Sequence, residues 1–288
     1  SDSYDDDTGQ QIEDSQNIFE TETTTTATIS TTSEAPQSQL AQPNSMTEKN
    51  RLYCMVPFIW SPRFLHSYHA IHATWGKRCH ILRFFIDPII GDSLVGYYNM
   101  TLASDVIAAA KNANLTLPND VVVLHDIQRP WHTCREENEA KTCRNIWEKI
   151  WRSWVYVVSG KGGSTPTSID VGVGAHSSEW FVKVDSDTFL FPENLSRYVK
   201  SRNWSYDDHH YFGHVLNHRV KDRGVPFVAG AAVFFSRATL LAAADSFQNM
   251  PMESGDEEED GTCRDAWTGA EEVVTAVCLK DHSNIIAE

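Results

Sequence analysis

From Arg51 to the end of the chain, short apolar runs of strand length alternate with segments of helical period. The runs typical of strands cover residues 53–60, 81–86, 121–124, 180–184 and 227–235. Apolar residues at helical spacing cover 67–75, 145–158, 238–244 and 271–279, and a loop is expected over 161–167. This alternation is typical of an α/β domain, so we expect a Rossmann-like, mostly parallel sheet flanked by helices.

The first 50 residues differ from the rest of the chain in composition. They hold ten acids and one base, Lys49, and a Thr-rich stretch over 21–35 is followed by Pro36 and Pro43. Without an apolar period such a segment cannot bury a core, so we expect a disordered, Thr/Ser-rich acidic stem over residues 1–50. It is either a plain linker or a mucin-like, O-glycosylated stalk, and the Thr and Pro content favours the stalk. Residues 51–288 then form one domain.

The formal net charge of -15 comes from two segments. Residues 1–50 and the six acids within 253–260 account for all of it, which leaves 23 acids and 23 bases elsewhere. The expected domain is therefore neutral and has no basic excess of the kind that nucleic-acid binding requires. No apolar run reaches the roughly 18 residues of a membrane span, so we expect no bilayer-crossing segment within the chain.

Six cysteines and four glycosylation sequons indicate a secretory route. The cysteines form no C-x-x-C pair, which disfavours a zinc ribbon or a thioredoxin-type site. Their even number suits three disulfides, although 15 pairings are conceivable and six buried thiols remain the alternative. The cysteines are Cys54, Cys79, Cys134, Cys143, Cys263 and Cys278, and the sequon asparagines are Asn99, Asn114, Asn194 and Asn203.

The most informative stretch is an apolar strand that runs into Asp185-Ser186-Asp187. In an open α/β sheet, ligands bind beyond the carboxyl ends of strands, where this pair of carboxylates would lie. Hard ions such as Mn²⁺ or Mg²⁺ prefer oxygen ligands and keep positions open for phosphate. A D-x-D sequence alone is a weak signal, because it occurs often in solvated turns. The preceding buried strand makes a metal and diphosphate site an equal alternative.

With these residues in order, the chain resembles the inverting β-1,3-glycosyltransferases, and within them the core 1 β-1,3-galactosyltransferase group. The resemblance covers residues 51 to the end, with a poor match over 87–142. Its anchors follow one another along the chain: Ala73-Thr74-Trp75, Arg78-Cys79, Trp147, Trp180-Phe181, Lys183, Asp185, Asp187-Thr188, Asn194-Leu195, Tyr211-Phe212-Gly213, Gly230-Ala231, Ser236, Glu271-Glu272 and Cys278.

The resemblance implies a GT-A fold and a UDP-sugar-dependent hexosyltransferase that uses Mn²⁺ or Mg²⁺. The sugar expected is galactose, transferred in β-1,3 linkage to a glycan or O-glycoprotein acceptor. Asp185, Ser186 and Asp187 would bind the donor, with Asp185 and Asp187 as metal ligands. Glu272 would be the catalytic base and Glu271 the second candidate.

The resemblance further implies disulfides between Cys54 and Cys79 and between Cys263 and Cys278, which leaves Cys134 with Cys143. It implies a type II membrane protein of the Golgi lumen, anchored by a segment outside this chain, with a homodimer as one arrangement of the protein.

Three departures from the family pattern keep another interpretation open. The family's glycine-rich stretch is reduced to Ala229-Gly230-Ala231-Ala232, and its usual Glu-Asp pair is Glu271-Glu272 here. The family also continues to a metal-ligating His, whereas this chain stops at Glu288, so that ligand is missing or the chain is truncated. The alternative is a non-catalytic relative that acts as a chaperone or as a glycan-binding protein. The acid pair 271–272 would then be an ordinary first helical turn.

Overall fold

The structure is a computed structural model that describes residues 51–90, 108, 110–112, 114–125, 127, 131–136, 139–144, 146–165, 174–220, 223–249, 263 and 271–288. Only the backbone is described at 87–90, 131–136, 139–144, 174, 218–220, 223–224 and 248–249. All of these residues belong to one compact unit, Met46–Glu288. The predicted boundary between residues 50 and 51 stays a prediction.

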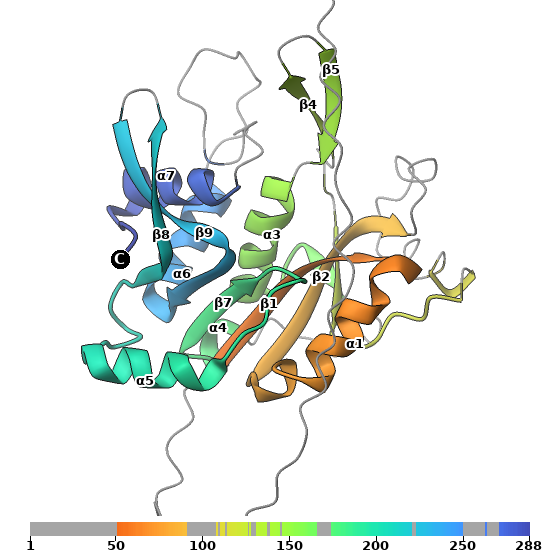
Figure 1. Cartoon of the computed structure of the whole chain (residues 1–288), viewed down its shortest axis with the longest axis horizontal. Helices are drawn as coiled ribbons and strands as arrows, with labels where there is room; N and C mark the ends of the chain where they lie inside the picture. Colours follow the sequence, from red (N-terminus) through yellow and green to blue (C-terminus); the bar gives the residue numbers. More distant parts are fainter. Residues whose placement is uncertain are drawn as a thin grey trace, which may run out of the picture. The chain divides into compact units, whose positions relative to one another are not determined.

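Seven of the described strands form one mixed sheet in the order β6-β3-β2-β1-β7-β9-β8 (Figure 1). The central strands β3 (Val121–Leu124), β2 (Ile81–Ile90), β1 (Leu52–Trp60) and β7 (Trp180–Val184) run parallel. The edges are antiparallel, with β6 (Gly163–Ser164) on β3 and with β9 (Arg223–Ser236) between β7 and β8 (Tyr211–Val220). The predicted α/β class with a mostly parallel core is confirmed.

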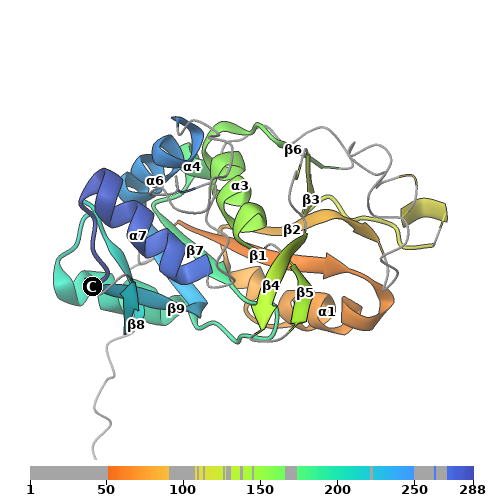
Figure 2. The ribbon, with the colours of Figure 1, turned by 90° about the horizontal axis from the view of Figure 1, so that it is seen from above.

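Helices cover both faces of this sheet (Figure 2). α1 (Leu65–Ala73) and α5 (Pro192–Arg202) pack on one face, and α3 (Ile146–Ser159), α6 (Arg237–Asn249) and α7 (Glu271–Ser283) pack on the other. Shorter helices are η1 (Pro62–Phe64), η2 (Gly76–Arg78) and α4 (Gly174–Ser177). No helix among the described residues has both the length and the apolar character that a membrane span needs.

The strands are almost wholly apolar because helices bury both of their faces. In β1, Tyr53 and Met55 point to the core under α3, α6 and α7, whereas Cys54 and Val56 point to the core under α1 and α5. The two-residue period of a strand therefore divides one apolar run between two cores. Cys54 is joined to Cys79, just after η2, so the predicted disulfide between them is confirmed.

Several elements were missed or misplaced by the sequence pattern. The expected loop over 161–167 contains β6, whose short pairing to β3 uses Gly163 and Ser164. The helix α5 was not predicted, nor was the hairpin of β4 (Trp131–Glu136) and β5 (Glu139–Arg144). Cys134 and Cys143 lie on these paired strands, two positions out of register, and their predicted disulfide falls outside the described side chains.

Candidate active site

Successive strands of the chain are placed first on one side of β1 and then on the other. From β1 the chain adds β2 and β3 on one side and then returns to place β7 on the other side of β1. Pairing of β1 with β7 runs only from Leu52 to Met55, and it ends before Pro57, a residue with no N–H to donate. Such a switch point is where open α/β sheets bind ligands, beyond the carboxyl ends of the strands.

Asp185 and Asp187 lie at this switch point, immediately after β7. The Asp185 N–H donates to Ala231 O of β9 at 3.1 Å, and the Thr188 N–H donates to Asp185 O at 3.0 Å. The second bond closes a four-residue turn, which holds the two aspartates at its first and third positions. Asp185 and Ser186 are half-buried and Asp187 is exposed. The turn therefore presents one partly shielded carboxylate and one open to solvent.

Lys183 connects the aspartate turn to the start of α7. Its side chain is only 4% exposed, and its Nζ donates to Gly230 O at 2.9 Å and forms an ion pair with Asp185 Oδ1 at 2.9 Å. The same Nζ pairs with Oε1 of Glu271, which is also 4% exposed. Lysine and glutamate are almost never buried to this extent unless they are paired. Three segments distant in sequence thus meet at one ammonium group.

The charges in this acid cluster (Lys183, Asp185, Asp187, Glu271 and Glu272) do not balance. Burial raises the pKa of Glu271 from 4.5 to about 7, against the opposing effect of Lys183, and the neighbouring carboxylates add to the rise. Burial lowers the pKa of Lys183, but Glu271 and Asp185 outweigh it and raise the net value. The neighbouring carboxylates therefore make both Glu271 and Lys183 hold their protons more tightly. The cluster is therefore an attractive place for a cation.

Glu272 is the more accessible member of the α7 acid pair. It is half-buried, and a Cβ at position 230 would overlap its Oε1, so only glycine lets this carboxylate approach β9. The one glycine that the sequence keeps in this stretch is the one the acid pair needs. Tyr211 borders the pair; its burial raises the pKa of its hydroxyl, and its Oη accepts the Val228 N–H at 3.0 Å. This phenol stays neutral beside the carboxylates.

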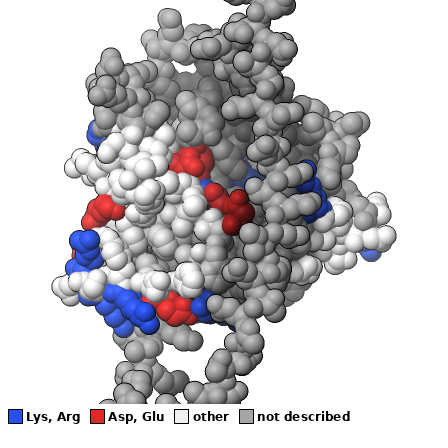
Figure 3. All heavy atoms as spheres, viewed as in Figure 1, with Lys and Arg blue, Asp and Glu red and all other residues white. Residues whose placement is uncertain are grey.

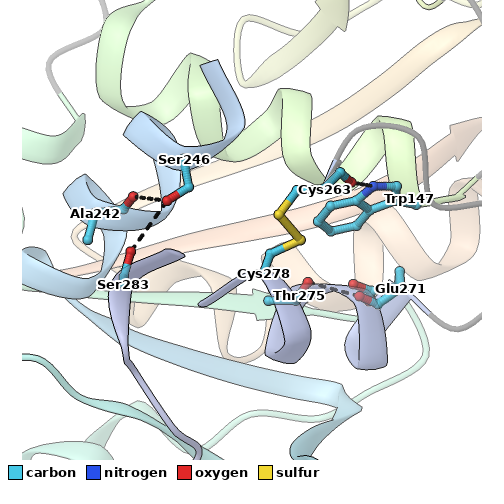
Figure 4. Close-up of a disulfide and its surroundings, with 8 residues drawn as sticks. All are labelled: Trp147, Ala242, Ser246, Cys263, Glu271, Thr275, Cys278 and Ser283. Carbon is cyan, nitrogen blue, oxygen red and sulfur yellow. Dashed lines mark hydrogen bonds between the residues drawn. A yellow bond between two sulfur atoms is a disulfide. The ribbon is translucent and has the colours of Figure 1, made fainter. Parts of the chain in front are cut away.

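A disulfide fixes the helix that carries both glutamates (Figure 4). Cys263 is bonded to Cys278 of α7, as predicted, and Cys263 O accepts a hydrogen bond from Trp147 Nε1 of α3. At the start of the helix, Thr275 Oγ1 donates to Glu271 O at 2.9 Å. Because α7 is tied to α3 in this way, the position of its first turn is set by the core and not by the acid cluster alone.

Two carboxylates can bind a divalent cation only if other oxygen ligands complete the shell. No group of three or more His, Cys, Asp or Glu side chains among the described residues could hold a metal ion. Asp185 uses Oδ1 for Lys183, while its other oxygen and the exposed Asp187 remain as oxygen donors. Mg²⁺ in proteins is commonly held by one or two carboxylates together with substrate phosphates, so this donor set fits such a cation.

Part of the acid cluster is open to solvent, because Asp187 is exposed and Asp185 and Glu272 are half-buried. Figure 3 shows acidic side chains both near the middle and toward the rim of the face seen in Figure 1, with most of the basic ones toward its rim. A cation could therefore reach Asp187 from solvent.

A second buried lysine, Lys149 of α3, was missed by the sequence reasoning. It is 2% exposed and donates to Phe58 O near the carboxyl end of β1. Lys183 was noted only as part of a motif and was given no role. The available signal was the same for both: a cation within a segment whose neighbours are apolar must find a partner inside the protein.

The remaining predicted residues lie away from the acid cluster or outside the described part. Asn114, Asn194 and Asn203 are exposed, as glycosylation requires, and Asn99 lies outside the described residues. Asn203 is the left-handed C-cap of α5, with φ of 54°, which asparagine tolerates better than most residues. Glycosylation of these residues stays a prediction.

The two disulfides within the described residues are compatible with a lumenal or secreted domain. Neither a protein-family model nor a curated protein sequence matches the chain.

Proposed function

We propose that this protein is a metal-dependent inverting glycosyltransferase of the GT-A type. It moves a sugar, galactose in the first instance, from a UDP-sugar to a glycan or glycoprotein acceptor in β-1,3 linkage. The observation that carries the proposal is the meeting of two acidic pairs through Lys183 at the switch point of an α/β sheet. One pair suits a cation with a diphosphate, and the other suits removal of a proton.

Asp185 and Asp187 would hold the cation, Mn²⁺ or Mg²⁺, through the oxygens that Lys183 does not use. When bound, the cation would neutralise the negative charge that develops on the departing diphosphate. The paired and buried Lys183 keeps Asp185 oriented, so the chain's own contribution is a preformed ligand geometry.

Glu272 would accept the proton of the acceptor hydroxyl in a single in-line displacement. It is the accessible member of the pair, whereas Glu271 is buried and its Oε1 is committed to Lys183. A base must reach its substrate before its pKa matters, and this favours Glu272 over Glu271. Glu271 would instead hold the start of α7 against β7. The setting we propose is the Golgi lumen, reached through an N-terminal anchor.

The direct test is UDP release over a panel of UDP-sugars, with Mn²⁺ and then with a chelator in its place. We expect release from at least one donor, its loss with the chelator, and its loss again in the variant Asp187→Asn. The matched control is Asp207→Asn, because Asp207 is an exposed aspartate and its ion pair with Arg237 is long at 3.8 Å. Metal-independent release, or equal losses in both variants, would contradict the proposal.

A further inference from the structure

Two phenylalanines follow the aspartate turn and face solvent. Phe189 is 52% exposed and Phe191 is 57% exposed, whereas Phe181 of β7 and Phe212 of β8 are buried. Their ring centroids are 5.0 Å apart with an interplanar angle of 55°. They come two and four residues after Asp187, so the pair begins where the candidate metal site ends. We call Phe189 and Phe191 the aromatic pair.

The backbone accounts for the orientation of the rings. Leu190 between them is 7% exposed and belongs to the core under α1 and α5. In an extended segment, neighbours on either side of a buried residue point the opposite way, so both rings are directed outward. The buried Leu190 holds this segment in place, and so it also fixes the position of the aromatic pair on the surface.

Local stability does not explain the choice of these residues. Phe191 is the N-cap of α5, with φ of -111° and ψ of 85°, and no side chain caps the helix. Ser, Thr, Asp or Asn at an N-cap would stabilise the helix relative to an apolar residue. Local rules are broken most often at functional sites, and an exposed apolar patch beside a site commonly marks a ligand surface.

We infer that the aromatic pair binds the pyranose ring of the acceptor, an inference that rests on the proposed function. A sugar ring has an apolar face of C–H groups, which packs on an aromatic ring, and a rim of hydroxyls that stays in water. The pair carries no charge and lies beside the carboxylates, so it suits a neutral acceptor sugar rather than the diphosphate of the donor. Its place beside the aspartate turn would keep the acceptor close to the reacting centre.

The test compares the double variant Phe189→Ala/Phe191→Ala with the control Leu216→Ala/Leu241→Ala. The control residues are also exposed apolar side chains, at 41% and 40%, on β8 and α6. We expect the acceptor KM to rise about tenfold in the aromatic variant, because the sugar would lose its packing on both rings; tenfold corresponds to about 1.4 kcal/mol. Donor hydrolysis by water should not change in either variant, because it needs only the metal and donor site.

Three outcomes would overturn the inference. These are an unchanged acceptor KM, a rise in the donor KM that matches the acceptor effect, and a rise seen with a glycopeptide but not with a methyl glycoside. The second would assign the rings to the uracil of the donor, and the third would assign them to a peptide.

A measurement without turnover separates this inference from the proposed function. Saturation-transfer NMR would use the full chain with methyl glycosides of galactose, N-acetylgalactosamine and N-acetylglucosamine. We expect saturation of the ring C–H protons of at least one sugar with the wild type and with the leucine control, and its loss in the aromatic variant. If none of the three sugars shows saturation transfer with the wild type, the inference is overturned, even if UDP release is observed.

Discussion

The two edges of the parallel strands carry charged residues of different character. At the carboxyl edge, the acid cluster surrounds the buried Lys183 with an excess of carboxylates. At the amino edge, Arg51 and Glu179 precede β1 and β7 and form an ion pair of 3.4 Å, with side chains 47% and 19% exposed. The first set is unbalanced and centred on two buried groups, Lys183 and Glu271, whereas the second is balanced and partly solvated.

The amino edge has a hollow. A cavity of about 820 Å³ is lined there by residues that include Arg51, Glu179, Lys200, Trp204 and Tyr206. Its volume is within the range of ligand pockets, yet the Trp204 ring is already stacked on His210 at 4.2 Å. If the acid cluster is the active site that we propose, space alone does not mark such a site. Buried charge without local balance is the indicator that we use instead, because perturbed ionisable groups gather at functional sites.

The largest expected difference between the edges is in turnover. Glu272→Gln should lower kcat by about 10²–10⁴-fold, the usual contribution of a general base, while leaving UDP and Mn²⁺ binding in place. Glu179→Gln at the amino edge should change kcat by less than about twofold, because its partner Arg51 is solvated. Steady-state kinetics of the two variants measure this. A similar loss in both would show that the edges are equivalent, and a loss with Glu271→Gln alone would move the base to Glu271.

Sequence reasoning located this site through the aspartates but not through their connections. An apolar strand that ends in Asp185 and Asp187 predicts a pair at a sheet edge, because strand period and sheet class fix where a strand end lies. The i, i+2 spacing does not predict that Lys183 joins Asp185 to Glu271, since that contact spans 88 residues and depends on how β9 brings α7 to the sheet. Long-range contacts of this kind follow from the topology and not from any local pattern.

The missed elements have similar causes. The helix α5 begins with Phe191 and Pro192 and has no polar N-cap, so its start gives no usual signal. The strand β6 is two residues long and includes Gly163, which a strand pattern cannot distinguish from a loop. The sequence pattern did not predict that the aromatic pair is exposed, because Phe189, Leu190 and Phe191 form one apolar run. Which residue of such a run faces the core is decided by packing alone.

The second difference between the edges should appear in stability. Lys183→Met removes one partner of a buried pair, and we expect the free energy of unfolding to fall by about 3–5 kcal/mol at pH 8. Arg51→Met should cost about 0–1 kcal/mol, and less in high salt, because the Arg51–Glu179 pair is exposed. Urea unfolding of both variants at low and high salt measures this. Equal costs, or a loss of the Lys183 effect in high salt, would show that the acid cluster is solvated.

The smallest expected effect is a pH dependence specific to Glu271. Its pKa is about 7 in the folded protein and 4.5 when unperturbed, so the folded state binds more protons between these two values. Stability from this group is then fully present below pH 4.5, falls as the pH rises to about 7, and is lost above it. The shift corresponds to about 3 kcal/mol at most. Urea unfolding in the presence of a chelator measures the free energy of unfolding of the wild type and of Glu271→Gln. The difference between these two free energies should change between pH 4.5 and about 7.

A difference that stays constant from pH 4 to 8 would mean that Glu271 has the same pKa in the folded and unfolded states, with Lys183 offsetting the effect of burial. The acid cluster would then be as balanced as the Arg51–Glu179 pair, and the contrast between the edges would be one of burial only. A difference that does change would show that the carboxyl edge holds a proton near neutral pH. Divalent cations should displace that proton. When the pH series is repeated with Mn²⁺, the fall in stability should therefore move to lower pH in the wild type alone.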